Sequence, residues 1–267
     1  MDDEPAAPPA LAPLAARLRA AGCVFAEDEA ELLLDAAASS PAGLESMMLR
    51  RIAGEPLEQV VGWASFAGLR IHLDPGVFVP RRRTEFLVTV ALGLPCPTPT
   101  VAVDLCCGSG AVGAALAAAL PSCELHAADI DPAAVACARR NLPPSSVHEG
   151  DLFEALPASL RGRIHLLAAN VPYVPTRDIP FLPAEAREHE PHTALDGGED
   201  GLAVARRAAE GAAEWLAPGG HFLMEATQAQ VPLALRVFED SGLTGRVVVD
   251  EEWECRVVVG TRAGTGG

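Results

Sequence analysis

Hydrophobic positions follow a helical pattern in the first part of the chain. From residue 14 to about residue 51 they recur at helical spacing, with breaks at Gly22 and at Ser39-Ser40-Pro41. This predicts about three short helices in a small N-terminal bundle. Residues 1–13 are acidic and rich in Pro and Ala, which is typical of a frayed tail. The bundle contains no candidate catalytic residue, so it is either a packing unit or a unit that docks a partner.

Short β-prone runs follow the bundle. The runs at residues 60–66 and 69–73 surround Ala67-Gly68 and predict a hairpin. Thr84 is placed to cap a helix over residues 86–92. We therefore divide the chain into an N-terminal helical domain (1–58), a hairpin linker (59–80) and a main domain (81–267).

From residue 100 onwards, apolar runs alternate with helical patterns. The predicted strands cover residues 100–104, 124–129, 147–152, 164–169 and 221–225. Helices are predicted over residues 111–120, 132–141, 202–216 and 231–241, and two runs at 246–250 and 255–259 predict an antiparallel hairpin at the sheet edge. This alternation predicts an α/β fold with a largely parallel sheet. Residues 174–200 are predicted to form a long loop, which in a compact domain usually serves function.

Four successive predicted strands end in a polar residue: Asp104, Asp129, Asp151 and Asn170. The carboxyl ends of parallel strands meet at one edge of the sheet, where open α/β proteins bind ligands. The small residues that follow Asp104 allow a ligand to approach the loop and the helix N-terminus. Asp129 lies about 20 residues beyond that loop, a spacing that suits a carboxylate bonded to ribose hydroxyls.

The segment Asn170-Val171-Pro172-Tyr173 follows a buried strand and carries a second kind of chemistry. Pro172 lacks an N–H and disfavours helix at Val171, so the carbonyls of the turn remain free as acceptors. An Asn oxygen, a free carbonyl and an aromatic ring together can hold a planar –NH2 group. The alternative is a turn that simply ends the strand.

Composition limits the classes of function. The 267 residues are 49% hydrophobic and carry a net charge of −16, with a pI near 4.8. Every positively charged side chain other than His is arginine, and the acidic balance disfavours a nucleic-acid substrate. The triple arginine at residues 81–83 is either a solvated loop or a clamp near an anion. No apolar run approaches the roughly 18 residues of a membrane helix, and the N-terminus is acidic, so we expect a cytoplasmic protein.

Cysteines and histidines predict no metal site. The seven cysteines are scattered at no disulfide spacing, which favours reduced thiols. Cys106-Cys107 has no CxxC partner, and the pair His189 and His192 has no third ligand nearby in the sequence.

These motifs together resemble the HemK/PrmC-type protein-(glutamine-N5) methyltransferases over most of the chain. The resemblance rests on Glu55-Pro56-Leu57, Gly68-Leu69, Asp74-Pro75-Gly76-Val77, Pro80-Arg81 with Thr84-Glu85, residues 104–110, Asn170 with Pro172-Tyr173, Glu190-Pro191-His192 and Asp196-Gly197-Gly198. It implies a class I S-adenosylmethionine-dependent methyltransferase domain, Rossmann-like, with an N-terminal helical domain. It also implies a protein substrate, a peptide chain release factor methylated on the glutamine of a Gly-Gly-Gln motif.

The resemblance also assigns roles to residues. It implies that the cofactor contacts Asp104, Cys106, Cys107, Gly108, Ser109, Gly110, Asp129, Ile130, Asp151, Leu152 and Asn170. The substrate motif matches Asn170, Val171, Pro172 and Tyr173, with Val171 in place of the family's first proline. Arg82 and Arg83 likewise stand where the family has Pro-Glu. A related branch with another protein substrate fits equally well.

The residues suggest a mechanism and leave alternatives open. Asn170 Oδ1 and the Val171 carbonyl would accept the two N–H bonds of the amide, while Tyr173 packs on its plane. The same chemistry would serve an amino-methyltransferase of nucleic-acid bases or of a small molecule. A binding module that holds the cofactor without turnover is the non-enzymatic alternative.

Overall fold

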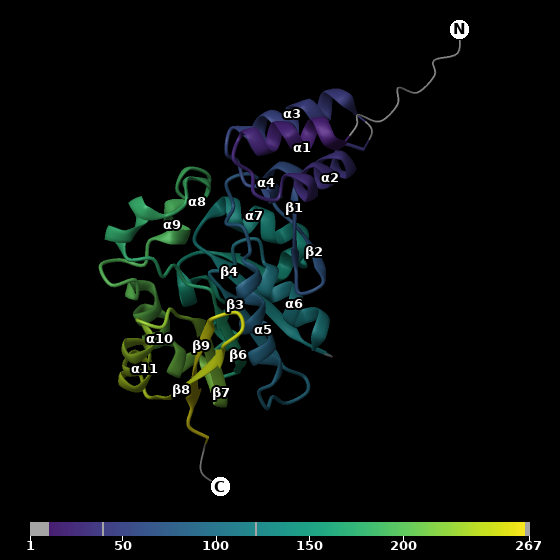
Figure 1. Ribbon diagram of the computed structural model, residues 1–267. Helices are drawn as coiled ribbons and strands as arrows, with labels where there is room; N and C mark the ends of the chain where they lie inside the picture. Colours follow the sequence, from purple (N-terminus) through teal and green to yellow (C-terminus); the bar gives the residue numbers. More distant parts are fainter. Residues whose placement is uncertain (1–10, 39, 121, 265–267) are drawn as a thin grey trace.

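A seven-stranded sheet forms the centre of the larger part of the molecule. The computed structural model describes residues 11–38, 40–120 and 122–264, and the sheet order is β5-β4-β3-β6-β7-β9-β8 (Figure 1). Its strands are β3 (Val101–Leu105), β4 (Glu124–Asp129), β5 (Val147–Glu149), β6 (Ile164–Ala169), β7 (Leu216–Glu225), β8 (Leu243–Asp250) and β9 (Cys255–Arg262). Strands β3 to β7 pair in parallel, whereas β9 is antiparallel to both β7 and β8. The predicted α/β fold and its hairpin at the sheet edge are confirmed.

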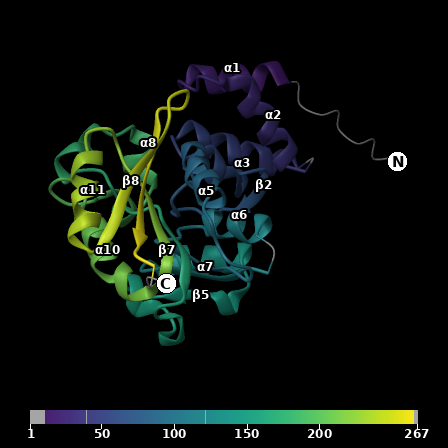
Figure 2. The same ribbon diagram turned by 90° about the horizontal axis from the view of Figure 1, so that it is seen from below.

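Helices cover both faces of this sheet and produce three layers. Figure 2 shows α5, α6 and α7 on one side and α10 and α11 on the other. These helices are α5 (Glu85–Leu92), α6 (Ala111–Ala119), α7 (Pro132–Asn141), α10 (Ala203–Trp215) and α11 (Val231–Asp240). Two buried clusters of apolar side chains, one on each face, hold the layers together. Because both faces are covered, the central strands are apolar along nearly their whole length.

Asp131 shows how local sequence sets a helix boundary. Its side chain accepts the Ala133 N–H at 2.9 Å, and Pro132 occupies the first turn of α7. An Asp cap followed by proline is a favoured helix start, because both satisfy or remove unpaired N–H groups. The predicted start and end of this helix are confirmed.

The N-terminal helices pack on their own apolar core. They are α1 (Leu11–Ala20), α2 (Ala26–Ala36), α3 (Pro41–Ile52) and α4 (Leu57–Val61), and their buried cluster is drawn from residues 14–60. The predicted bundle is confirmed, but α1 already begins at Leu11, within the predicted tail. Residues 1–10 of that tail lie outside the described residues. No helix among the described residues is long and apolar enough to cross a membrane.

Two expectations about the hairpin region are wrong. Val60 and Val61 belong to α4, because the helix starts after Pro56 and ends at Gly62, which has φ of +81°. This helix spans the domain boundary predicted between residues 58 and 59. The hairpin is therefore shorter, with β1 (Trp63–Phe66) paired to β2 (Leu69–His72).

Thr84 makes no side-chain cap to α5, since its hydroxyl donates to Glu225 Oε2 at 2.8 Å.

Residues 174–200 are largely helical and not the predicted loop. They contain the 3-10 helix η5 (Thr176–Phe181), α8 (Ala184–His189) and α9 (His192–Leu195). The prolines that suggested a loop, Pro175, Pro183 and Pro191, each occupy the position just before one of these helices. Proline is well suited to helix starts because its φ is already helical and it removes an N–H that would lack a partner.

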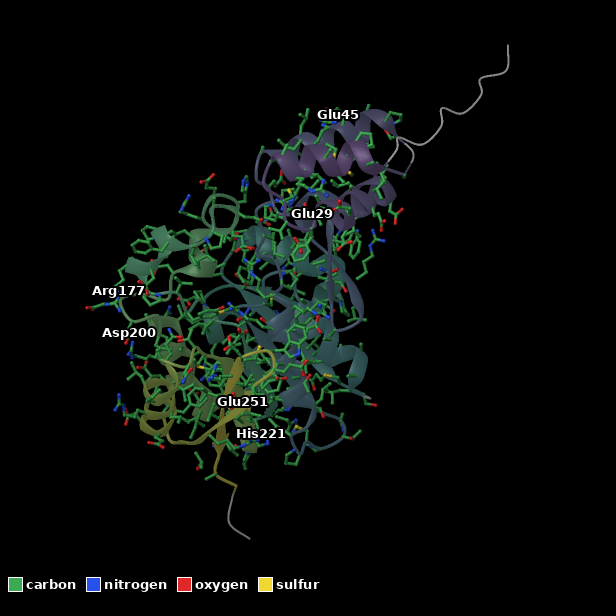
Figure 3. All side chains as sticks on the ribbon, in the orientation of Figure 1. Glu29, Glu45, Arg177, Asp200, His221 and Glu251 are labelled. Atoms are coloured by element: carbon green, nitrogen blue, oxygen red, sulfur yellow. The ribbon has the colours of Figure 1, made fainter. Side chains whose placement is uncertain are left out.

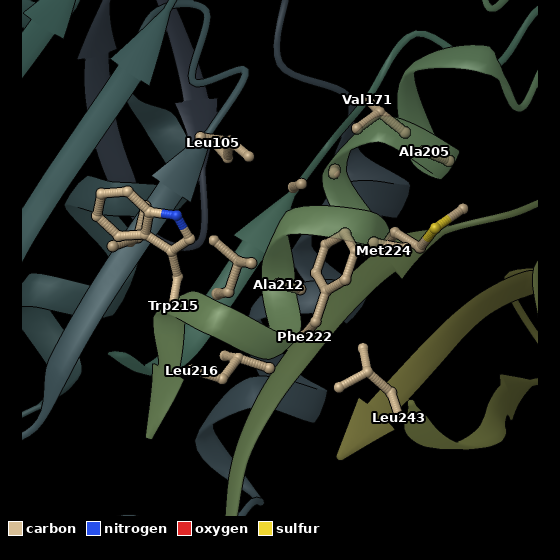
Figure 4. Packing of buried hydrophobic residues seen from close by; sticks show 14 of the residues in the cluster. Leu105, Val171, Ala205, Ala212, Trp215, Leu216, Phe222, Met224 and Leu243 are labelled. Atoms are coloured by element: carbon tan, nitrogen blue, oxygen red, sulfur yellow. The ribbon is translucent and has the colours of Figure 1, made fainter. Parts of the chain in front are cut away.

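Four further 3-10 helices connect this frame, and one buried cluster includes a residue of the site. The remaining 3-10 helices are η1 (Arg82–Thr84), η2 (Pro144–Ser146), η3 (Leu152–Ala155) and η4 (Ala158–Leu160). Figure 4 shows Val171 packed in the apolar cluster with Ala205 and Met224. The turn after β6 is thus anchored by the core.

Gly201 sets the position of the Tyr173 backbone and provides a test of this packing. Its φ is +78°, and a Cβ there would overlap the Tyr173 carbonyl oxygen and Gln230 Nε2. We expect Gly201→Ala to lower the free energy of unfolding, measured by urea denaturation, by roughly 1–3 kcal/mol more than a matched control. That control is Gly242→Ala, which has the same φ of +78° but open space around the added methyl group. Equal losses in the two variants would show that the contact with Tyr173 is not tight.

Candidate active site

A cavity of about 1110 Å³ opens at the carboxyl edge of the sheet. The four polar strand ends predicted to meet there, Asp104, Asp129, Asp151 and Asn170, all line it. The other predicted cofactor and substrate residues that line it are Cys106, Cys107, Gly108, Ser109, Ile130, Leu152, Val171, Pro172 and Tyr173. Of the predicted residues, Gly110 is not part of the lining. Segments far apart in sequence are therefore brought together by the topology of the sheet.

The loop after β3 is shaped by unusual backbone angles. Cys106 and Gly108 have φ of +57° and +54°, and the Gly108 N–H donates to Asp129 Oδ2 at 2.8 Å. A Cβ on Gly108 would meet nothing within 4 Å, so the backbone faces open space. Gly110 is required for a different reason: its φ is +78° and a Cβ would press against Leu142. The loop therefore exposes its backbone at Gly108 to the cavity, whereas at Gly110 it packs closely against Leu142.

Asp129 holds this loop in place. Its Oδ1 accepts the Asp131 N–H at 2.9 Å while Oδ2 accepts the Gly108 N–H. Burial raises the pKa of Asp129, and the backbone N–H donors counteract that rise. Each carboxylate oxygen has further lone pairs, so the group can still accept ligand hydroxyls.

Asp104 lies deeper than Asp129. Its side chain is 1% exposed, and Oδ2 accepts the Gly113 N–H at 2.8 Å inside the first turns of α6. Burial raises its pKa to about 8, with a further contribution from the negative charge of Asp129. Its hydrogen bond fixes the helix that follows the glycine loop.

Asp151 and Leu152 form the opposite wall. Asp151 Oδ2 lies 2.6 Å from Arg207 Nη2, an arginine of α10 that also lines the cavity. Leu152 has φ of +49°, and Ile130 presents a 59% exposed side chain. The Asp151 carboxylate can accept a hydrogen bond from an amino group on a flat ring, and Leu152 and Ile130 can pack against that ring.

Asn170 is the residue with an unused acceptor. Its Oδ1 is buried and has no hydrogen-bond partner in the described part of the chain. The other such atom there is His221 Nε2, in β7 and outside the cavity lining (Figure 3). Because buried polar atoms are nearly always paired, this oxygen on a residue of the cavity lining is a candidate acceptor for a ligand donor, which it can reach when the Asn170 amide turns toward the cavity.

Val171 turns its side chain into the core and is 1% exposed. No hydrogen bond among the described residues uses its N–H. The position therefore needs a buried apolar group and no donor, and proline meets both requirements as well. The replacement of the family's proline leaves the carbonyl of this residue at the site.

The three arginines at residues 81–83 all have partners within the protein. Arg81 bonds the buried Glu190 at 2.6 Å, and the Arg82 guanidinium lies 5.0 Å from the centre of the Trp253 ring. Arg83 bonds Glu225 at 2.9 Å and donates to the Tyr173 hydroxyl. Neither a purely solvated loop nor a free anion clamp describes them.

Glu225, Trp253 and Arg207 were not predicted. Glu225 ends β7, so the signal that found the other four strand ends applies to it as well. Trp253 lies in the turn between β8 and β9, and Arg207 lies on the face of a helix, where the sequence carries no comparable signal. All seven cysteines are free thiols. The described residues contain no group of three side chains that could hold a metal ion.

The residues present fit S-adenosylmethionine. Asp129 would accept the ribose hydroxyls, Asp151 and Leu152 would border the adenine, and the bare backbone around Gly108 leaves room for the rest. A cationic ligand also suits the cavity end that holds the Asp129 carboxylate.

Comparisons with known proteins agree with this geometry. A family model described as "Methyltransferase small domain" matches residues 68–173. The chain is 35% identical to the release factor glutamine methyltransferase of Geobacter sulfurreducens over 227 residues, which cover 84% of this chain and 78% of that protein. It is 36% identical to a 4-amino-L-phenylalanine/4-methylamino-L-phenylalanine methyltransferase of Streptomyces pristinaespiralis over 201 residues, 72% of this chain and 68% of that protein. A solved methyltransferase structure from Pyrococcus furiosus shares the fold, with a TM-score of 0.55 at 16% identity over 82% of this chain and 98% of that one.

Asp129 gives the first test of the cofactor site. Asp129→Ala removes a charged acceptor worth about 1.5–3 kcal/mol, so S-adenosylmethionine should bind roughly 10- to 100-fold more weakly in calorimetry. Glu149→Ala makes the same change in net charge at an exposed position of the neighbouring strand and should bind normally. Unchanged affinity in Asp129→Ala would remove this residue from the site.

The pH dependence of the free energy of unfolding tests the burial of Asp104. Its pKa is raised from 3.8 to about 8 on folding, so the folded state holds a proton that the unfolded state has lost between these values. This group therefore makes the free energy of unfolding fall as pH rises from about 4 to 8. Asp104→Asn keeps the acceptor for Gly113 without the titration, so its stability relative to the parent should rise across that range. Urea denaturation at pH 5 and pH 8 without cofactor measures this, and a pH-independent difference would contradict it.

Proposed function

The chain belongs to the release factor glutamine methyltransferase family, and from that premise we propose that it methylates the side-chain amide nitrogen of a glutamine in a peptide chain release factor. The methyl donor is S-adenosylmethionine. The observation that carries the proposal is that Asn170, a residue of the cavity lining, has a buried Oδ1 with no hydrogen-bond partner among the described residues. The substrate places the reaction in the cytoplasm.

The chemistry explains why an acceptor is needed at Asn170. An amide nitrogen is a poor nucleophile, because its lone pair is delocalised into the carbonyl group. Asn170 Oδ1 and the Val171 carbonyl accept its two N–H groups and turn the nitrogen toward the methyl group. They also offset the positive charge that develops on nitrogen, since the nitrogen–methyl bond would form as the sulfur–methyl bond breaks, and the nitrogen would then release one proton to water. S-adenosylmethionine, when bound, supplies an electrophilic methyl group on a cationic sulfur.

Positioning accounts for the rate enhancement without a covalent intermediate. Holding the amide and the methyl group in line can lower the barrier by up to about 7–11 kcal/mol. Tyr173 contributes a ring for the amide plane, and its own carbonyl is fixed by Gln230 Nε2 at 2.8 Å. The core packing of Val171 fixes the other acceptor.

A second candidate substrate is a small aromatic amine. The relative from Streptomyces pristinaespiralis is named for methylation of an amino group on a phenylalanine ring, and such a group is also a planar –NH2. The two candidates separate in one assay, in which a release factor, a Gly-Gly-Gln peptide and 4-aminophenylalanine are incubated with labelled S-adenosylmethionine. We expect label on the release factor, located on the glutamine by mass spectrometry. Label on the amine alone would overturn the proposal.

Asn170 is the central test of the mechanism. Asn170→Ala removes one acceptor of the substrate amide, so turnover on the methylated substrate should fall by about 10²–10³-fold. Binding of S-adenosylmethionine, measured by calorimetry, should change little.

Val171→Pro serves as the matched variant at the adjacent position. Proline keeps the carbonyl and removes an N–H that has no partner among the described residues, so activity on a Gly-Gly-Gln substrate should hold or rise. Near-normal turnover in Asn170→Ala would show that the acceptor is not used.

A further inference from the structure

Glu225 is a fifth polar strand end that does not reach the main cavity. It closes β7 and is 7% exposed. Oε2 accepts the Thr84 hydroxyl at 2.8 Å, and Oε1 lies 2.9 Å from Arg83 Nε. It lines a smaller pocket of about 190 Å³ together with Arg83 and Tyr173. Because Glu225 does not line the main cavity, it can affect a substrate there through the residues to which it is bonded.

Arg83 connects this carboxylate to the substrate motif. Its Nη2 donates to the Tyr173 hydroxyl, and the guanidinium carbon lies 5.5 Å from the centre of the tyrosine ring. The arginine side chain is itself half exposed. Since a half-exposed arginine has many rotamers in water, the bond to the buried Glu225 selects the one that reaches Tyr173.

Tyr173 is held at two ends by different residues. Gln230 bonds its carbonyl oxygen, and Arg83 is the partner of its hydroxyl among the described residues. The backbone bond sets where the residue lies, but the ring can still turn about its side-chain bonds. The hydroxyl bond therefore fixes the direction in which the ring points from the backbone, because it holds the oxygen at the far end of the ring.

We propose that Glu225 is a positioning residue for methyl transfer, which through Arg83 fixes the position of the Tyr173 ring beside the substrate amide. The inference rests on the proposed function for its kinetic test. It assigns to Glu225 and Arg83 a part in turnover, distinct from the binding of S-adenosylmethionine.

The chain contains a matched ion pair that serves as a control. Glu190 is 6% exposed and bonds Arg81, a neighbour of Arg83 in the same run. It also accepts a second hydrogen bond, from the Val79 N–H at 3.3 Å. The Arg81 guanidinium likewise lies beside an aromatic ring, 5.0 Å from the centre of Phe78. The two glutamates thus have similar burial and the same charge, but of the two, Glu225 is the one bonded to an arginine that contacts Tyr173.

A double-mutant cycle measures whether Glu225 affects kcat through the Tyr173 hydroxyl. Glu225→Gln should lower kcat by roughly 10-fold or more with an unchanged Kd for S-adenosylmethionine. Tyr173→Phe should lower kcat as well, and adding Glu225→Gln to it should cause no further loss, because the hydroxyl is already absent. Glu190→Gln, by contrast, should combine additively with Tyr173→Phe.

A second measurement needs no turnover. Tyr173 is the single tyrosine of the 267 residues, so protein with ring-13C-labelled tyrosine gives signals from this residue alone in NMR spectra. Glu225→Gln and Arg83→Gln should shift or broaden these signals, while Glu190→Gln should leave them unchanged. Urea denaturation of each variant shows whether it remains folded.

The two measurements separate the inference from the proposed function. If no glutamine substrate is methylated but the tyrosine signals respond to Glu225→Gln, the proposed function fails and the connection to Tyr173 stands. Additive effects of Glu225→Gln and Tyr173→Phe on kcat, or tyrosine signals that respond equally to Glu190→Gln, would overturn the inference.

Discussion

The carboxyl ends of parallel strands meet at one edge of a sheet, and the site of this protein depends on that geometric constraint. Strands β3 to β7 run in parallel, so residues more than 120 positions apart in the chain, from Asp104 to Glu225, come to the same edge. Helices on both faces bury the strands and keep the edge rigid. The loops after the strands then need only a few special angles, such as those of Cys106 and Gly108, to form a cavity.

The polar groups at this edge are paired in a regular way. Asp129 bonds the backbone of the glycine loop, Asp151 bonds Arg207, and Glu225 bonds Arg83. Unpaired buried charges are costly, so these pairs hold the walls of the cavity in one arrangement. Against that background Asn170 is distinctive, since among the described residues of the cavity lining its Oδ1 is the buried side-chain acceptor without a partner.

The departures from the family pattern are accommodated within the protein. Val171 replaces a proline at a position where the side chain enters the core, so an apolar residue of similar size is suitable. Arg82 and Arg83 lie against Trp253 and Tyr173, two aromatic residues that border the cavity. These changes alter the surroundings of the substrate motif and leave the acceptors of Asn170 and Val171 in place.

Local patterns in the sequence determined the elements whose boundaries are marked by local chemistry. The bounds of β4, β6 and α7 agree with the predictions, because strand ends at Asp129 and Asn170 and the cap at Asp131 are set by neighbouring residues. The same patterns identified the four polar strand ends and the family. Only the tertiary structure decided that Thr84 bonds Glu225 instead of capping, and which partner each arginine of the run selects. These outcomes depend on contacts between residues as far as 141 positions apart, and periodicity or capping signals report only on residues within a few positions of each other.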